Sequence, residues 1–473
     1  MIFKVLSLLQ YFRINDPYRL LGLLAIFILI SLPVFIDAPE LTYPELKSLV
    51  IGQKVHHGAS LYTQIVDSSG PLAGWFNALL DVIFGRSLTA RHILGFILIF
   101  IQAAYIGIVF SKQKAFAEQT YIPSLIYVVA CCFSFDTLSL TPELLGAGAL
   151  LPALSSLFKE IEFREQRSES IFSVGLYISI ASLFSFSYSI LLIGAFITLS
   201  AFTRSNVRKY LLLFVGFALP HLLLLAMYFL KDGLTAVWQF YYVPNFTIHA
   251  ARYISTGGLW TLLTLPLIYL VVSVVLMNRE ARLSKYQTQL VQAMFFWTLF
   301  ALAQVFISRD FRPQNFVSVI PGLSFFVTHF LLIMPKRKFA EIAVWIFIVG
   351  ILLIANLARY GVLSNVNYRD LIVQRDTRFP YQNKRVLVLD EGWDVYADNT
   401  MASPFLDWNL TRSIFSQPEY YENVILVSRG LTGDAPEVIR DKHNLMQPYL
   451  ERLPELRKRY KRQGEYYLLN SGK

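Results

Sequence analysis

The chain has 473 residues, of which 55% are hydrophobic and 16% are charged, and its mean hydropathy is +0.49. Soluble globular proteins rarely reach this combination, so the composition argues against a soluble enzyme and indicates a polytopic membrane protein. The net charge of +10 does not require a nucleic-acid partner, because membrane proteins collect Lys and Arg on their cytoplasmic side. We therefore expect membrane lipid, and no nucleic acid, among its partners.

The first element is an amphipathic stretch within residues 1–17. It precedes an apolar run and has no small-residue cleavage site behind it, which argues against a cleavable signal peptide. We expect residues 1–17 to lie along the cytoplasmic face of the membrane.

Continuous apolar windows then predict an all-α polytopic protein with about eleven transmembrane helices. The spans are expected near residues 18–36, 92–110, 121–135, 142–158, 171–186, 188–203, 210–230, 259–277, 289–307, 316–334 and 339–360. The runs at 171–186 and 188–203 are separated by almost no loop, so they are either a tight hairpin or one broken pair. If the N-terminus is cytoplasmic, all six inside loops are basic, which supports this count and orientation. These loops carry Lys4 and Arg13; Lys112 and Lys114; Lys159, Arg164 and Arg167; Arg204, Arg208 and Lys209; Arg279, Arg282 and Lys285; and Lys336, Arg337 and Lys338.

Two long segments are predicted on the outer face. The first, residues 37–91, exceeds a simple connection, and its two amphipathic pieces at 43–55 and 72–84 predict interfacial helices. The second is a small α/β domain at 361–473, outside the transmembrane region of 18–360. Strands are expected at 386–389, 424–427 and 466–469, with a charged helix at 446–461. The segments 136–143, 231–258 and 308–315 are also expected on this face.

Three motifs carry a family resemblance. They are the Gly58–Leu72 pattern G-x-x-L-Y-x-x-I-x-D-x-x-G-P-L, the segment F-G-R-S-L-T-A-R at Phe84–Arg91, and R-D-F-R-P-Q-N-F at Arg309–Phe316. Together with the many spans and the external α/β tail, they resemble membrane glycosyltransferases of the GT-C superfamily, in particular the protein-mannosyltransferase and aminoarabinose-transferase branch. The resemblance implies transfer of a sugar from a polyprenyl-phosphate or polyprenyl-diphosphate carrier to a protein, lipid or glycan acceptor on the outer face.

Such a reaction needs a general base for the acceptor hydroxyl. In the resembling enzymes an acid soon after the first span is catalytic. The sequence here reads Asp37-Ala-Pro-Glu40 and then Pro44-Glu45. Glu45 is the favoured candidate, with Asp37 and Glu40 as rivals, and the alternative is that Glu45 caps its helix. Glu143, at the mouth of the fourth span, is either functional or a first-turn carboxylate, and Asp136 has the same ambiguity.

The leaving phosphate needs cations or hydrogen-bond donors. Arg309 and Arg312, three residues apart beside a span, are the first candidates. The second-line candidates are Arg252, His249 and Lys231. The alternative for the arginines is ordinary snorkelling to the interface. Gln314 and Asn315 are expected to bind sugar hydroxyls. The remaining candidate for substrate binding is Asp67, which could equally hold the fold of its loop.

Other chemistries have little support in the sequence. There is no GxxxxGK[ST], GxGxxG or HExxH motif, and no ligand set at zinc spacing, so we predict no resident metal ligands. No cofactor is certain, and a divalent cation stays possible. The few cysteines and short loops favour a bacterial inner membrane. The main alternative function is a catalytically inactive GT-C-like scaffold in cell-envelope assembly or secretion, and a transporter is a weaker one.

Overall fold

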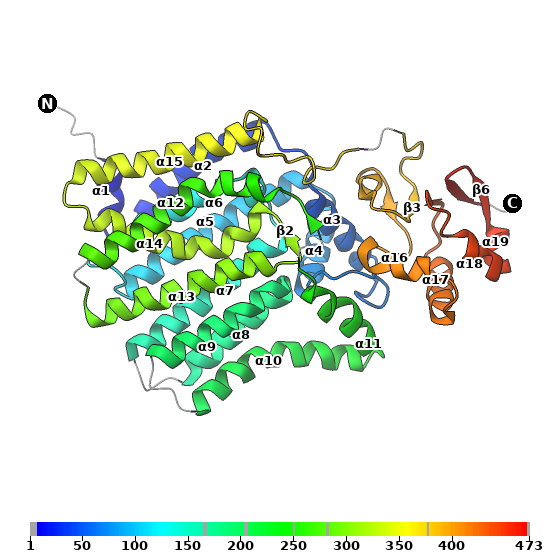
Figure 1. The fold of residues 1–473 in the computed structure, drawn as a ribbon, viewed down its shortest axis with the longest axis horizontal. Helices are drawn as coiled ribbons and strands as arrows, with labels where there is room; N and C mark the ends of the chain where they lie inside the picture. The colour runs from blue at the N-terminus through cyan, green and yellow to red at the C-terminus, as the bar shows by residue number, and fades with distance from the viewer. Residues whose placement is uncertain are drawn as a thin grey trace. The chain divides into compact units, whose positions relative to one another are not determined.

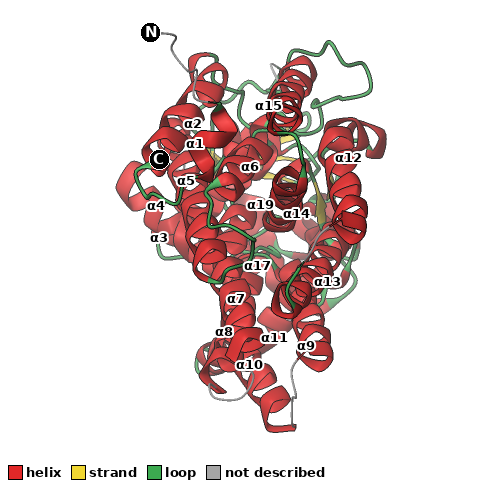
Figure 2. Ribbon diagram, turned by 90° about the vertical axis from the view of Figure 1, so that its left-hand side faces the viewer, coloured by secondary structure: helices red, strands yellow, loops and turns green. Residues whose placement is uncertain are grey.

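The computed structural model describes residues 7–163, 168–202, 207–248, 251–280, 283–375 and 378–470. Its contacts divide the chain into two compact units, each built from three stretches of sequence. The first comprises Met1–Pro39, Leu88–Leu223 and Ala251–Asp370, and the second comprises Glu40–Ser87, Leu224–Ala250 and Leu371–Lys473. Figures 1 and 2 show that helices dominate the chain and that strands are few and short.

The first unit is a helical bundle. Its elements are α1 (Leu8–Arg13), α2 (Arg19–Ile36), α5 (Leu88–Lys112), α6 (Ile122–Cys131), η1 (Phe135–Leu138), α7 (Pro142–Phe163), α8 (Ser168–Phe184), η2 (Phe186–Ile190), α9 (Leu191–Phe202), α10 (Val207–Phe229, whose end belongs to the second unit), β1 (Ala251–Arg252), α12 (Thr256–Glu280), α13 (Lys285–Ile307), β2 (Asp310–Phe311), η5 (Pro313–Val319), α14 (Ile320–Ile333) and α15 (Arg337–Arg359).

Within the described residues, eight helices are long and apolar enough to cross a membrane. They are α2, α5, α7, α10, α12, α13, the η5–α14 segment and α15. The chain is therefore a multi-pass membrane protein. The other three predicted spans correspond to the shorter apolar helices α6, α8 and α9. The runs at 171–186 and 188–203 are two helices joined by the 3₁₀ turn η2.

The core of the bundle lies around the η5–α14 segment, which is 89% buried over its apolar window. Helices α6, α12 and α13 pack against α14, while α8 packs against α7. By contrast, only 17% of the corresponding window of α2 and 22% of that of α10 is buried. Apart from Arg208 in the first turn of α10, the side chains that these two helices leave exposed are apolar, as expected for surfaces that face lipid.

The second unit contains the remaining elements. They are α3 (Tyr43–His56), α4 (Pro71–Phe84), α11 (Leu234–Val237), the π-helix η3 (Trp238–Tyr242), η4 (Pro244–Phe246), β3 (Arg385–Val388), η6 (Trp393–Ala397), β4 (Thr400–Met401), α16 (Trp408–Ser416), α17 (Tyr421–Gly433), β5 (Val438–Arg440), α18 (Gln447–Arg452), α19 (Pro454–Arg459), β6 (Tyr460–Gln463) and β7 (Tyr466–Leu469). Five strands form one mixed sheet in the order β4-β3-β5-β7-β6. Strand β3 pairs in parallel with β4 and β5, and β7 pairs antiparallel with β5 and β6.

The two helices predicted in the segment 37–91 are present as α3 and α4, which pack against each other. Residues next to these helices contact the C-terminal part of the same unit: Val66 forms a bridge to Phe405, and Arg86 Nη2 donates to the carbonyl of Tyr396 at 2.6 Å. The long loop and the C-terminal segment therefore form one folded unit.

Two of the C-terminal predictions need correction. The expected strand at 424–427 is wrong, because these residues lie inside helix α17. Val424, Val427 and Leu431 are its buried positions, and this spacing places them on one face of a helix. The expected helix at 446–461 is instead two short helices, α18 and α19, and its last two residues begin strand β6.

Candidate active site

Two of the segments predicted on the outer face meet in the first unit. The connection between α6 and α7 contains η1, and it packs against η5, which follows α13. Gly95 of α5 supports this junction, since a Cβ there would lie 2.2 Å from the carbonyl oxygen of Leu138. The sequence predicted polar side chains in both segments, and the fold brings them together.

The centre of the junction is an ion pair between Arg312 and Glu143. Only 4% of the Arg312 side chain and 10% of the Glu143 side chain are exposed. Glu143 lies in the first turn of α7, and the hydroxyl of the buried Tyr188 donates to its carbonyl oxygen at 2.8 Å. Because the pair is buried, it differs from an arginine that snorkels to the interface.

Gln314 connects the two segments by hydrogen bonds. Its backbone N–H donates to Asp136 Oδ2 at 3.1 Å, its Nε2 donates to the Ser139 carbonyl at 2.8 Å, and its Oε1 accepts from Thr141 Oγ1 at 2.5 Å. These contacts span the turn from Asp136 to Thr141. Gln314 is therefore placed to hold the Asp136 carboxyl in a defined position.

Asp136 is buried, and burial raises the pKa of its carboxyl. Ser134, Arg312 and the Gln314 N–H act in the opposite direction without cancelling the effect of burial. The Ser134 hydroxyl also lies 3.2 Å from the hydroxyl of Tyr368. A carboxyl with a raised pKa is better matched to proton transfer near neutral pH than an ordinary aspartate.

The cluster keeps polar atoms available for a ligand. Arg312 Nε and Asn315 Oδ1 are buried and have no hydrogen-bond partner within the described part of the chain. Burial lowers the pKa of the Arg312 guanidinium, but Glu143, Asp310 and Asp136 outweigh it and raise the pKa. Arg312 is therefore a permanent cation with one free donor, and buried atoms of this kind normally have a partner.

Two more predicted arginines lie at the same junction. Strands β1 and β2 pair in parallel, with Arg252 level with Phe311, and the carbonyl of Arg309 accepts from Ala251 N at 3.2 Å. Arg252 is exposed, and Arg309 is half-buried. The backbone thus brings both arginines next to the segment of Arg312. His249 lies outside the described residues.

The acids predicted near the first span are divided between the two units: Asp37 belongs to the first, and Glu40 and Glu45 belong to the second. Glu45 forms a capping box at the start of α3, where its Oε2 accepts from Thr42 N at 2.9 Å and from Thr42 Oγ1 at 2.8 Å. Asp37 is 64% exposed and pairs with Arg359 at 3.3 Å. Glu40 is exposed. The capping role that the sequence left open for Glu45 is thus observed directly, and catalysis by any of the three stays a prediction.

Asp67 is buried in the second unit. Its carboxylate lies 2.6 Å from Lys47 Nζ and accepts from Ser69 N at 2.7 Å. Burial acts to raise the pKa of Asp67, but Lys47 and Ser69 outweigh it and lower the pKa. These contacts tie the 58–72 motif to α3, in line with the structural role that the sequence left open.

Sequence reasoning ranked Asp136 below Glu45 and did not single out Tyr188, Ser134 or Tyr368. The available signal was that Asp136 and Glu143 share one short turn between two apolar runs. In the described residues no group of three or more His, Cys, Asp and Glu side chains is placed to hold a metal ion.

The fold of the chain is similar to that of a solved protein. It resembles the GT-C glycosyltransferase ArnT from Cupriavidus metallidurans bound to undecaprenyl phosphate, with a TM-score of 0.55, 11% identity, and coverage of 95% of this chain and 98% of that one. The apo form of the same protein matches with a TM-score of 0.54 and 12% identity over the same shares of both chains. The expected GT-C-like fold is therefore confirmed, while identity this low shows the fold alone.

The family is also shown. A model described as "Family of unknown function (DUF6427)" matches residues 70–360, so the chain belongs to this family. No curated protein matches the sequence.

Proposed function

We propose that this protein is a membrane glycosyltransferase that moves a sugar from a polyprenyl-phosphate-type donor to an acceptor at the Arg312–Asp136 cluster. The observation that carries the proposal is the buried cluster itself: a cation and a carboxyl with a raised pKa lie together at one end of apolar helices in a GT-C-like fold. The solved relative ArnT, which binds undecaprenyl phosphate, supports the choice of donor class.

In this proposal Arg312 stabilises the leaving phosphate. As the bond between the sugar carbon and the phosphate oxygen breaks, negative charge develops on that oxygen, and a fixed cation in a dry site stabilises it strongly. Arg312 Nε is the free donor, and Glu143 positions the guanidinium from the other side. Arg309 and Arg252 contribute positive charge where the donor phosphate enters.

Asp136 is the proposed general base. It accepts the proton of the acceptor hydroxyl while the acceptor oxygen forms the new bond to the sugar carbon. Gln314 fixes Asp136 through its backbone N–H, and the free Asn315 Oδ1 is suited to accept a hydrogen bond from a sugar hydroxyl. This assignment places the base in the second outer segment instead of near Glu45.

An apolar pocket next to the cluster gives the lipid chain a place to begin. It has a volume of about 30 Å³ and lies among α6, α12, η5 and α14, with Phe133 and Phe316 at its lining. Phe133 directly precedes Ser134, and Phe316 directly follows Asn315. The pocket is too small for a polyprenyl chain, so we expect the helices around it to separate when the donor binds.

The proposal includes a topology in which the protein has about eleven spans and a cytoplasmic N-terminus. The cluster and the C-terminal domain then lie on the periplasmic side of a bacterial inner membrane. The basic loops support this orientation. The alternative of an inactive scaffold is favoured by one observation: Arg312 is paired with Glu143, as in a buried ion pair that holds a fold together.

The test is sugar transfer by the purified protein in lipid vesicles that contain a pool of labelled polyprenyl-phosphate sugars. Wild type is compared with Asp136→Asn and Arg312→Gln, with and without a chelator for divalent cations. Removing a general base is expected to lower the rate by roughly 10²–10⁴-fold, and removing the charge on the phosphate side by about 10²–10³-fold.

The matched control is Glu169→Gln, which removes an exposed acid in the first turn of α8 and is expected to leave the rate within about twofold. Transfer by no donor, together with full complementation of a deletion strain by Asp136→Asn, would support the scaffold function instead.

A further inference from the structure

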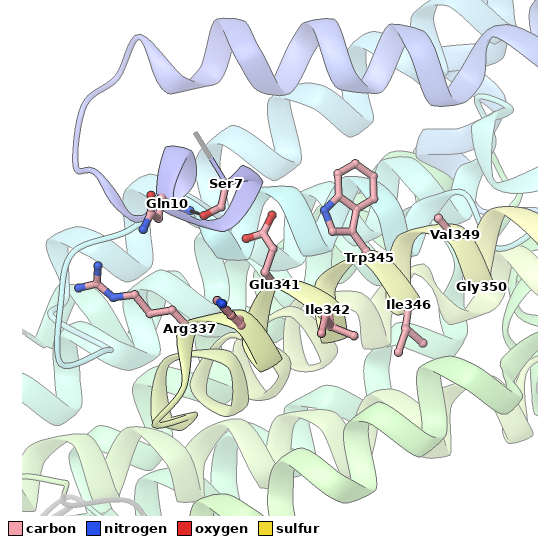
Figure 3. A pocket seen from close by; sticks show the side chains of 10 residues that line it. Ser7, Gln10, Arg337, Glu341, Ile342, Trp345, Ile346, Val349 and Gly350 are labelled. Carbon is pink, nitrogen blue, oxygen red and sulfur yellow. Dashed lines mark hydrogen bonds between the residues drawn. The ribbon is translucent and has the colours of Figure 1, made fainter. Parts of the chain in front are cut away.

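A second feature of the first unit lies along α15, away from the candidate active site. A groove of about 830 Å³ runs beside this helix. Its lining residues are Ser7, Gln10, Arg337, Lys338, Glu341, Ile342, Trp345, Ile346, Val349 and Gly350. Figure 3 shows Arg337 and Gln10 near one end of the groove and Val349 and Gly350 near the other.

The groove is polar and cationic at one end and apolar along the rest. Lys336, Arg337 and Lys338 are exposed in succession where α15 begins. Ile342, Trp345, Ile346 and Val349 follow at helical spacing and are also exposed. A second hollow of about 470 Å³ shares Ile342 and Ile346 and includes Lys336, so the apolar surface continues around the helix.

Glu341 is the acidic group in the groove. Its two carboxylate oxygens accept from the backbone N–H groups of Leu8 and Leu9, at 2.8 and 3.0 Å. This contact holds α1 against α15, so that Ser7 and Gln10 form one wall of the groove. The two cations that line the groove, Arg337 and Lys338, outnumber this one carboxylate and leave an excess of positive charge at this end.

The dimensions match half of a bilayer. Arg337 and Gly350 are 13 residues apart on one helix, which corresponds to about 20 Å. One leaflet contributes about 15 Å of hydrocarbon plus its headgroup layer. The cationic end follows α14, whereas the Arg312 cluster precedes it, so the two sites lie at opposite ends of that helix.

We propose that this groove binds one anionic phospholipid from the leaflet on the Lys336–Lys338 side. Arg337 and Lys338 bind the phosphate, Ser7 and Gln10 offer hydrogen bonds to the headgroup, and an acyl chain lies beside Trp345 and Val349. The charge at one end and the apolar length of the groove carry this inference, which does not depend on the glycosyltransferase proposal.

The test uses quenching of Trp345 fluorescence by brominated acyl chains. The full-length protein is placed in vesicles of brominated phosphatidylglycerol or brominated phosphatidylcholine, and the Trp345 signal is obtained as the difference between wild type and Trp345→Phe. We expect stronger quenching by the anionic lipid at equal mole fraction. Each cation near the membrane surface strengthens anionic binding about fivefold, so Arg337→Gln/Lys338→Gln should reduce the preference by roughly 25-fold.

The matched control is Arg279→Gln/Lys285→Gln, which removes two exposed cations that lie outside the groove. This control should keep the preference. Equal quenching by both lipids, an unchanged preference in the groove variant, or an equal loss in the control would overturn the proposal. Absence of quenching by either lipid would also overturn it and would indicate that a protein covers the groove.

Discussion

Replacement of Arg312 by glutamine is expected to destabilise the protein by about 3–5 kcal/mol, the cost of leaving a buried carboxylate without its partner. Only 4% of the Arg312 side chain and 10% of the Glu143 side chain are exposed, so this is a buried ion pair. The small stabilisation typical of surface ion pairs therefore does not apply to it. Glu143→Gln should cost less, roughly 1.5–3 kcal/mol, because Asp136 and Asp310 still stabilise the Arg312 charge. The double variant should cost less than the sum by about 1–3 kcal/mol.

The assay is equilibrium unfolding in mixed detergent micelles at increasing sodium dodecyl sulfate, followed by tryptophan fluorescence. The control is Arg375→Gln, which removes an exposed arginine 3.7 Å from Asp398 and should cost less than about 1 kcal/mol. If Arg312→Gln costs no more than this control, or if the two single effects simply add, the Arg312–Glu143 pair is not the desolvated unit described above.

Three further predictions test other parts of the structure. If Asp136 is the base, activity falls as pH drops through its raised pKa. Ser134→Ala removes an influence that lowers this pKa, so it should move the acid limb of the pH–rate profile to higher pH. An acid limb that stays in place or moves to lower pH contradicts the assignment. The lowered pKa of Asp67 means that its ion pair stabilises the fold above a pH of about 4 and that this contribution is lost as pH falls through the folded-state value. Lys47→Met should therefore cost about 3–5 kcal/mol at pH 7 and less in acid, as measured by unfolding at both pH values; an equal cost at both would refute this. Gly95→Ala should push the η1 backbone and cost about 1–3 kcal/mol, together with a loss of transfer, whereas Gly257→Ala, with open space around it, should do neither.

Much of the bundle could be predicted because hydropathy over long windows is a strong signal. The eight long helices coincide with predicted spans, and the strand at 466–469 was located to the residue as β7. The strand predicted at 424–427 is wrong because a run of four apolar residues shows neither a helical nor a strand periodicity. Its helix is decided by burial of Val424, Val427 and Leu431, which depends on tertiary contacts.

The site was predictable only in part, for a similar reason. Arg312, Gln314 and Glu143 were singled out by charge and position. The ion pair, however, joins Arg312 to Glu143, which are 169 residues apart in the chain. The capping function of Glu45 was visible as a local pattern, since Thr42 precedes it by three residues. The importance of Asp136 depends on its enclosure and on the Gln314 N–H, neither of which a single sequence reveals.

The most direct test of the central claim measures donor binding and sugar transfer on the same preparation of Asp136→Asn in lipid vesicles. The account predicts that this variant binds the polyprenyl-phosphate sugar about as tightly as wild type, because Arg312 and its neighbours are intact, yet transfers sugar at least about 100-fold more slowly. Transfer at the wild-type rate would contradict the assignment of the base. Loss of donor binding in Asp136→Asn, with Arg312→Gln binding normally, would contradict the division of roles in the cluster.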